Sequence, residues 1–183
     1  MATLRTICDH ILDICENAIN SGGNTGYLVI IETKNNFKFT ISDNGRGMDD
    51  LEIKKALDPF YTTKRNRKKK FGVGLSFLKF SVEKTGGTFN IYSKKNKGTN
   101  INANFILSNI DCQPVGDITT MILHVLNMSN NFHWKITRFY NKNGYNIDSK
   151  FLKENFDLTK PSDLKIIKNY ILNLEKEIKE EDK

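Results

Sequence analysis

Helix and strand patterns follow one another along residues 4–107 in an order that limits the fold to one class. Residues 4–19 place apolar side chains at steps of three and four, the period of an amphipathic helix, and Ser21-Gly22-Gly23 is a helix stop. Two short strands are predicted next, at residues 27–31 and 37–41, with a turn at Asn35-Asn36. The chain therefore begins with a helix and a β-hairpin.

A second group of helices and a second hairpin complete this order. We expect a short helix at residues 50–57, a longer helix from about residue 71 to the Gly86-Gly87 stop, and strands at residues 88–93 and 99–107. Helices separated by hairpins, without strand–helix–strand alternation, predict an α+β fold. The predicted architecture has helices on one face of a mixed, mostly antiparallel sheet.

The rest of the chain is predicted to be a small C-terminal α+β appendage. We place the boundary at residue 110, which gives a main domain at residues 1–110 and an appendage at residues 111–183. The appendage carries no chemical motif, and its role is open. Its predicted elements are a helix capped by Asp117 and running past Val125, strands at residues 132–140 and 145–147, and a final helix that begins at Pro161.

Net charge is concentrated in one segment. The chain has 28 Lys and Arg against 21 Asp and Glu, a formal net charge of +7. Residues 54–70 hold eight basic residues and one acid, so the remainder of the chain is neutral in sum. A nucleic-acid-binding protein with residues 64–70 as a basic arm is one hypothesis. No aromatic stacking motif or recognition-helix pattern accompanies the charge, which makes nucleic acid the weaker alternative.

Several other classes of protein are excluded by the sequence. No apolar run approaches the roughly 20 residues that a membrane span needs, and Asp9 and Asp13 interrupt the place of a signal peptide's apolar stretch. We therefore expect a cytoplasmic protein with no membrane contact. The three cysteines have no CxxC spacing, so neither a disulfide framework nor a zinc site is predicted.

One face of the first predicted helix carries acids and amides with no lysine among them. Such a stripe lacks the ion pairs that stabilise a solvated helix face, and its oxygen atoms are the ligands that Mg²⁺ prefers. The composition therefore favours a face that binds a metal ion, and an ordinary solvated helix face is the alternative. The stripe consists of Asp9, Asp13, Glu16, Asn17 and Asn20.

Three further short motifs follow this stripe. Each is weak alone, because an Asp-Asn-Gly turn is common after a strand and a Gly-x-Gly at a helix start often marks only a tight bend. Their joint order and spacing are specific. The motifs are Asp43-Asn44-Gly45-Arg46-Gly47, Asp58-Pro59-Phe60-x-Thr62-Thr63-Lys64, and Gly72-Val73-Gly74-Leu75.

Together the four motifs resemble the GHKL ATPase superfamily, whose members share the Bergerat fold, an α/β sandwich. The resemblance covers about residues 4–107 and implies binding of ATP with Mg²⁺. It implies that Asn17 is the metal-binding asparagine and that Asp43 reads adenine. It also implies nucleotide contacts from the remaining motif residues, namely Gly45, Gly47, Met48, Phe60, Lys64, Gly72, Val73, Gly74, Leu75 and Thr99.

The catalytic step is less typical of the family. Members that hydrolyse ATP carry a Glu as general base four residues before the Asn, and this chain has Asp13 there, with Glu16 directly before Asn17. Asp13 and Glu16 are therefore the candidate catalytic residues. A shorter carboxylate positions water less well, so we expect slow turnover if Asp13 is the base. The alternative is that Asp13 only orders water bound to the metal.

The resemblance implies a regulatory role on a partner protein. The chain looks like small stand-alone histidine-kinase-like ATP-binding proteins, which act as signalling kinases or slow ATPase switches. Some of these occur beside redox enzymes such as hydrogenases, so a redox enzyme is one candidate partner. Residues 111–183 would then contact that partner or a second copy of the chain.

Overall fold

The computed structural model describes residues 5–59 and 73–180. It confirms the α+β fold and each predicted helix and strand that falls in these ranges, and it adds the short helix α5. In chain order the elements are α1 (Ile7–Ile19), β1 (Thr25–Glu32), β2 (Asn36–Asp43), α2 (Asp50–Leu57), α3 (Val73–Lys84), β3 (Thr88–Ser93), β4 (Thr99–Ile106), α4 (Ile118–Asn127), β5 (His133–Tyr140), β6 (Asn143–Asp148), α5 (Ser149–Asn155) and α6 (Pro161–Glu180).

The strands form one sheet of six in the order β3-β4-β2-β1-β5-β6. Four of its five pairings are antiparallel, and β1 with β5 is the parallel one. The sheet is therefore mixed and mostly antiparallel, as predicted. In this register Asp43, the last residue of β2, lies opposite Gly26 of β1 and Thr99 of β4.

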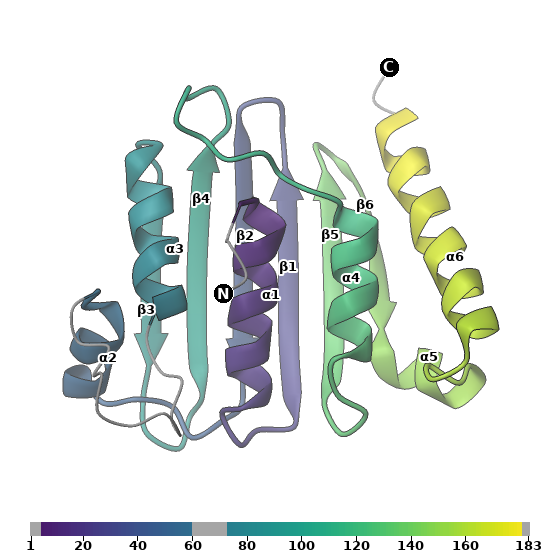
Figure 1. The fold of residues 1–183 in the computed structure, drawn as a ribbon, viewed down its shortest axis with the longest axis horizontal. Coiled ribbons are helices and arrows are strands. Elements are labelled where there is room, and N and C mark those ends of the chain that lie inside the picture. Colours follow the sequence, from purple (N-terminus) through teal and green to yellow (C-terminus); the bar gives the residue numbers. More distant parts are fainter. Residues whose placement is uncertain (1–4, 60–72, 181–183) are drawn as a thin grey trace.

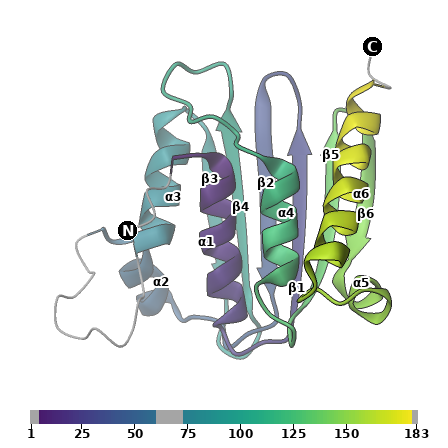
Figure 2. The ribbon, with the colours of Figure 1, turned by 45° about the vertical axis from the view of Figure 1, so that its right-hand side comes forward.

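The helices cover one face of the sheet, as Figure 1 shows for α1, α3, α4 and α6. Alternate strand residues point to that face and form the core with the apolar stripes of the helices. Helix α1 lies over the middle of the sheet, between α3 and α4, in both views (Figure 2). Apolar side chains at steps of three and four bury one side of α1, and its polar side remains accessible.

The C-terminal segment continues the same sheet. Eight residues of β5, from His133 to Tyr140, pair in parallel with the whole of β1. Helix α4 packs against α1, and α6 packs against α4 and β6. The domain boundary near residue 110 stays a prediction, and the sheet is continuous across the two segments that this boundary would separate.

A buried ionic cluster ties this segment to β1. Arg138 of β5 is fully buried, and its Nε donates to Glu175 Oε1 of α6 at 3.0 Å, while Nη2 donates to Glu32 of β1. Tyr145 of β6 donates its hydroxyl to the same Glu175 oxygen at 2.7 Å. Because each charge has a partner, the cluster is compatible with the core.

Candidate functional site

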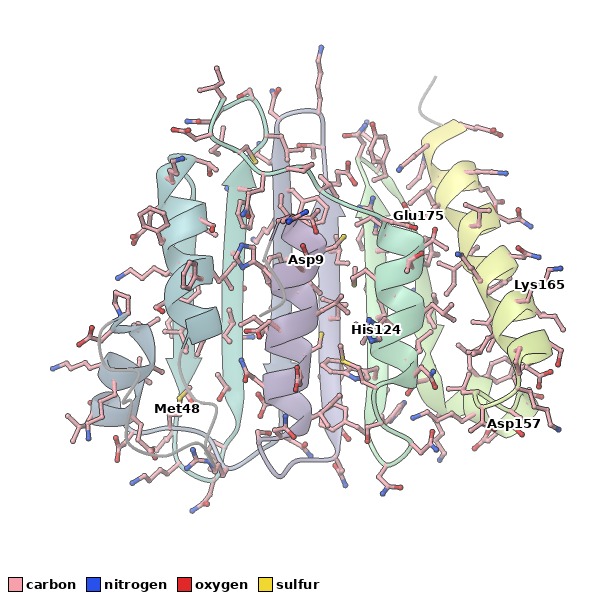
Figure 3. All side chains as sticks on the ribbon, viewed as in Figure 1. Asp9, Met48, His124, Asp157, Lys165 and Glu175 are labelled. Carbon is pink, nitrogen blue, oxygen red and sulfur yellow. The ribbon has the colours of Figure 1, made fainter. Side chains whose placement is uncertain are left out.

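The candidate site lies at one end of the sheet, where α1 ends, β2 ends and β4 begins. The loop after β2, residues 43–49, crosses this end and leads to α2. Figure 3 labels Met48 in this loop, and Asp9 lies toward the opposite end of α1. All four motifs have described residues, which come from α1, the 43–49 loop, the end of α2 and the start of α3, although only Asp58 and Pro59 of the 58–64 motif are among them.

Asp43 is the best-defined group of the site. Its Oδ1 accepts hydrogen bonds from the Gly45 backbone N–H at 2.8 Å and from the Ser21 hydroxyl at 3.1 Å. Burial raises the pKa of this carboxyl above its ordinary value, and the bonds from Gly45, Ser21 and the Thr99 backbone amide oppose that rise. The site thus holds a partly desolvated carboxylate in a fixed orientation.

Two glycines make this loop possible. A Cβ atom on Gly45 would lie 1.8 Å from Ser21 Oγ, so a larger residue would displace the hydroxyl that holds Asp43. Gly47 has a φ of +62°, and a Cβ there would lie 2.0 Å from the carbonyl oxygen of Lys94. The backbone of this loop therefore packs directly against the backbone of the turn between β3 and β4.

Ser93, at the end of β3, connects this loop to β4. Its Oγ accepts a hydrogen bond from the Met48 N–H at 2.8 Å and lies 2.9 Å from Thr99 Oγ1. The same oxygen donates to the carbonyl of Gly98 at 2.9 Å. Thr99 and Met48, both predicted site residues, are thus joined through one hydroxyl.

The acidic and amide residues of α1 have two roles: one caps the start of the helix, and the others lie at a candidate metal site. Asp9 accepts hydrogen bonds from the Thr6 and Arg5 backbone amides and forms a capping box with Thr6, so including Asp9 in the metal-facing stripe was wrong. Glu16 and Asn17 are exposed, and Asp13 is partly buried. Burial, and then the charge of Glu16, raises the pKa of the Asp13 carboxyl.

The start of α3 lies against Asp13. A Cβ atom on Gly74 would fall 1.5 Å from Asp13 Oδ2, so the carboxylate touches the backbone of the Gly-Val-Gly-Leu motif. Leu75 points into the core, with 8% of its surface exposed, and anchors the first turn of this helix. Helix α3 begins at Val73, while Phe60, Lys64 and Gly72 lie outside the described residues.

The oxygen donors on α1 fit Mg²⁺. Among the described residues, no three His, Cys, Asp or Glu side chains come together as metal ligands. Mg²⁺ usually takes only one or two protein oxygens, with water and phosphate oxygens filling its octahedron. The exposed Asn17 amide and Glu16 carboxylate are donors of this type at the free face of α1.

Two contributors to the site were not among the predicted site residues. Ser21 was assigned only to the helix stop, and Ser93 only to a strand end. The available signal was position: each serine lies where a strand or helix ends beside a turn that contains glycine, and serine hydroxyls commonly bond backbone groups there.

The sequence comparison decides the family. Residues 4–109 match the model of the family described as histidine kinase-, DNA gyrase B-, and HSP90-like ATPase. The chain belongs to this family. The matched residues include every described residue of the candidate site, and this match gives no support to the nucleic-acid alternative.

Curated relatives of this ATPase domain are sensor proteins. The chain is 34% identical over 104 residues to a "Putative sensor protein" of Shewanella frigidimarina, covering 55% of this chain and 16% of that protein. It is 33% identical over 102 residues to "Sensor histidine kinase YvrG" of Bacillus subtilis, covering 54% and 17%. The chain thus spans about one sixth of the length of either relative.

A solved structure shows a similar fold. The crystal structure of the N terminal domain of a DNA repair protein superposes with a TM-score of 0.53 at 15% identity, over 78% of this chain and 51% of that chain. The part of this chain that superposes is longer than residues 4–109, so the likeness of fold extends beyond the segment that matches the ATPase family. Within residues 5–59 and 73–180, no helix is both long and apolar enough to cross a membrane.

Proposed function

We propose that this chain is a module that binds ATP with Mg²⁺ and acts on a partner protein, as a regulatory kinase or a slow ATPase switch. The observation that carries the proposal is the Asp43 carboxylate, which is held by Ser21 and Gly45 at the end of β2. Membership of the ATPase family supports nucleotide binding. ATP is abundant in the cytoplasm, where we propose that the module works.

Asp43 would select adenine. A carboxylate accepts a hydrogen bond from the 6-amino group of adenine, whereas guanine presents a carbonyl oxygen at that position and is repelled. Three donors to Asp43 leave at least one of about four acceptor positions on a carboxylate for the base. Gly45, Gly47 and Met48 would border the base, with Thr99 supporting Asp43 from β4.

The phosphates would lie between α1 and the start of α3. Asn17 is the proposed Mg²⁺ ligand, with Glu16 beside it, and bound Mg²⁺ would neutralise charge on the phosphate oxygens. Backbone amides of Gly72, Val73, Gly74 and Leu75 would bind phosphate at the positive end of α3. Phe60 and Lys64 are proposed to close over the nucleotide from the basic segment.

Asp13 is the proposed general base or water-orienting residue. Its raised pKa favours proton uptake from water, while its short side chain predicts slow hydrolysis. A kinase role requires a phospho-acceptor on a partner, and a redox enzyme such as hydrogenase is one candidate. The partner contact is proposed to involve residues 111–183.

Calorimetry tests nucleotide binding directly. We expect wild-type protein with Mg²⁺ to bind ATP more tightly than GTP, and Asp43→Asn to lose most of the ATP affinity because an amide presents a donor to the amino group. Asp50→Asn, an exposed acid at the start of α2, is the matched control. Failure of the wild type to bind millimolar ATP would refute the proposal.

A labelling experiment separates the two activities. The protein is incubated with γ-labelled ATP and a lysate of the source cell. Label on a protein supports the kinase role, and label released as phosphate supports the ATPase role. If the label stays on the nucleotide, both activities are refuted.

A further inference from the structure

We propose that Ser21 is a positioning residue for base recognition: its hydroxyl fixes the Asp43 carboxylate in the orientation that accepts the 6-amino group of adenine. This inference rests on the proposed function and names a residue to which the sequence motifs assign no role. Ser21 lies just after α1, two residues beyond its last helical residue, Ile19.

The Ser21 hydroxyl connects the end of α1 to Asp43. Its oxygen lies 2.6 Å from the carbonyl oxygen of Ala18 and 3.1 Å from Asp43 Oδ1. A hydroxyl has one proton, so the two acceptors share it. The bond to Ala18 holds the serine side chain against the helix, and the carboxylate is held in turn.

The Ser21 backbone adds a second connection to the same loop. Its carbonyl oxygen accepts a hydrogen bond from the Arg46 N–H at 3.0 Å. Gly45 N–H donates to the Asp43 oxygen that Ser21 contacts, at 2.8 Å. The 43–46 turn is thus bound to the end of α1 by both the side chain and the main chain of one residue.

The Ser21 side chain occupies the space that a side chain at residue 45 would need. A Cβ on Gly45 would lie 1.8 Å from Ser21 Oγ and 2.4 Å from Ser21 Cβ, so the contact depends on the absence of a side chain at residue 45. Asn17 lies in the last turn of α1, four residues before Ser21. Ser21 therefore couples the helix that carries the proposed metal ligand to the carboxylate that reads the base.

The test combines a change in the protein with a change in the ligand. Calorimetry with Mg²⁺ compares ATP with purine riboside triphosphate, which lacks the 6-amino group, on wild type and on Ser21→Ala. We expect Ser21→Ala to lower the affinity for ATP about five- to tenfold, which is the effect of one hydrogen bond. The affinity for the analogue should fall less than about twofold. In an Asp43→Asn background, Ser21→Ala should add no further loss for ATP.

Ser42→Ala is the matched control. Ser42 precedes Asp43 on β2, and its hydroxyl accepts a bond from Asn100 on the sheet face away from the helices, so we expect both ligands to bind it as they bind wild type. Ser21→Cys retains the shape but is a weak donor, and we expect it to weaken ATP selectively as well. It provides a second test if Ser21→Ala unfolds.

The outcomes distinguish the two proposals. Wild-type protein that binds neither ligand refutes both the proposed function and the role of Ser21. If wild type prefers ATP and the Ser21 variants lower the affinity for both ligands equally, or for neither, the positioning role is refuted. The proposed function is then left intact. Selective loss for ATP in both variants supports it.

Discussion

The Asp13 carboxylate of α1 lies against the backbone of Gly74 in the first turn of α3. A Cβ atom at Gly74 would lie 1.5 Å from Asp13 Oδ2 and 2.7 Å from its Cγ. The carboxylate is thereby placed at the N-terminal end of α3, which carries the partial positive charge of the helix dipole. The two motifs that flank the proposed phosphate site are thus in direct contact.

Substitution of Gly74 tests this contact. In Gly74→Ala the new methyl group forces the Asp13 side chain to rotate away, and we expect ATP hydrolysis to fall at least tenfold if Asp13 orients the attacking water. Stability should fall by about 1 kcal/mol, because the flexible carboxylate can move. In an Asp13→Ala background the same substitution should cost no stability, because the clash is gone. Urea unfolding of the four proteins measures the coupling, and equal costs in both backgrounds would refute the contact.

The pH dependence of ATP binding should report Asp43. Burial raises the pKa of this carboxyl, so it takes up a proton at a higher pH than an ordinary aspartate and then loses an acceptor position. We expect the ratio of ATP affinity to purine riboside triphosphate affinity to fall as the pH is lowered from neutral. Calorimetry across pH measures this ratio, in which effects of pH on phosphate and Mg²⁺ cancel. Asp43→Asn should give a ratio that does not change with pH.

Stability should depend on pH through His10 of α1. His10 is 1% exposed, its Nε2 lies 2.9 Å from Gln113 Oε1, and its Nδ1 has no hydrogen-bond partner among the described residues. Burial lowers the pKa of this imidazole from 6.5. Below pH 6.5 the unfolded chain therefore takes up a proton that the folded chain does not, and the free energy of unfolding should fall, by at most about 1.4 kcal/mol per pH unit.

Two histidine variants isolate this effect. His10→Gln removes the titrating group, so urea unfolding at several pH values should show a weaker loss of stability on acidification than in wild type. His124→Gln, which replaces an exposed histidine of α4, controls for loss of a histidine as such. An unchanged slope in His10→Gln would contradict the prediction.

The Arg138 cluster should dominate the stability of the C-terminal half. Arg138→Met removes the buried guanidinium that pairs with the partly buried Glu32 and the buried Glu175, and leaves Glu175, among the described residues, only the half-exposed Lys179 as a cation, at 3.6 Å. We expect a loss of about 3–5 kcal/mol in the free energy of unfolding. Lys135→Met, at an exposed position of the same strand, should change it by less than about 0.5 kcal/mol. A loss below about 1 kcal/mol for Arg138→Met would show that the cluster is not a stabilising feature.

Local periodicity was sufficient to predict most elements but not all of their pairings. Alternation in β2 and β4 predicts strands because one face of each is buried, and glycine stops predict the helix ends. The parallel pairing of β5 with β1 joins residues about 108 positions apart, and no local pattern records which strand lies beside which. Arg138 shows the same limit, since its partners on β1 and α6 are distant in sequence.

The site was predictable where glycine geometry restricts the sequence. Gly45 and Gly74 belong to recognisable motifs because a side chain at either position would strike Ser21 or Asp13. Asp9 was misassigned because a capping acid and a metal-facing acid have the same helical period. Ser21 was not assigned to the site because its position beside a glycine turn does not reveal its distance to Asp43, which only the fold brings to hydrogen-bonding range.

Truncation tests whether residues 1–107 form a self-sufficient ATPase domain. In the full chain β1 is an interior strand, with β2 on one side and β5 on the other. Removal of residues 108–183 leaves the eight residues of β1 with an unpaired edge and removes α4, which packs against α1. We therefore expect the 1–107 fragment to be largely unfolded or aggregated, with no measurable ATP binding.

Complementation provides the control for this truncation. Co-expression of residues 1–107 with residues 108–183 should restore a folded complex, because the second fragment supplies β5, α4 and the partners of Glu32. Circular dichroism and size-exclusion chromatography measure folding and association, and calorimetry measures ATP affinity. A monomeric 1–107 fragment with wild-type ATP affinity would show instead that the C-terminal segment is a separable appendage, and that its pairing with β1 contributes little to the site.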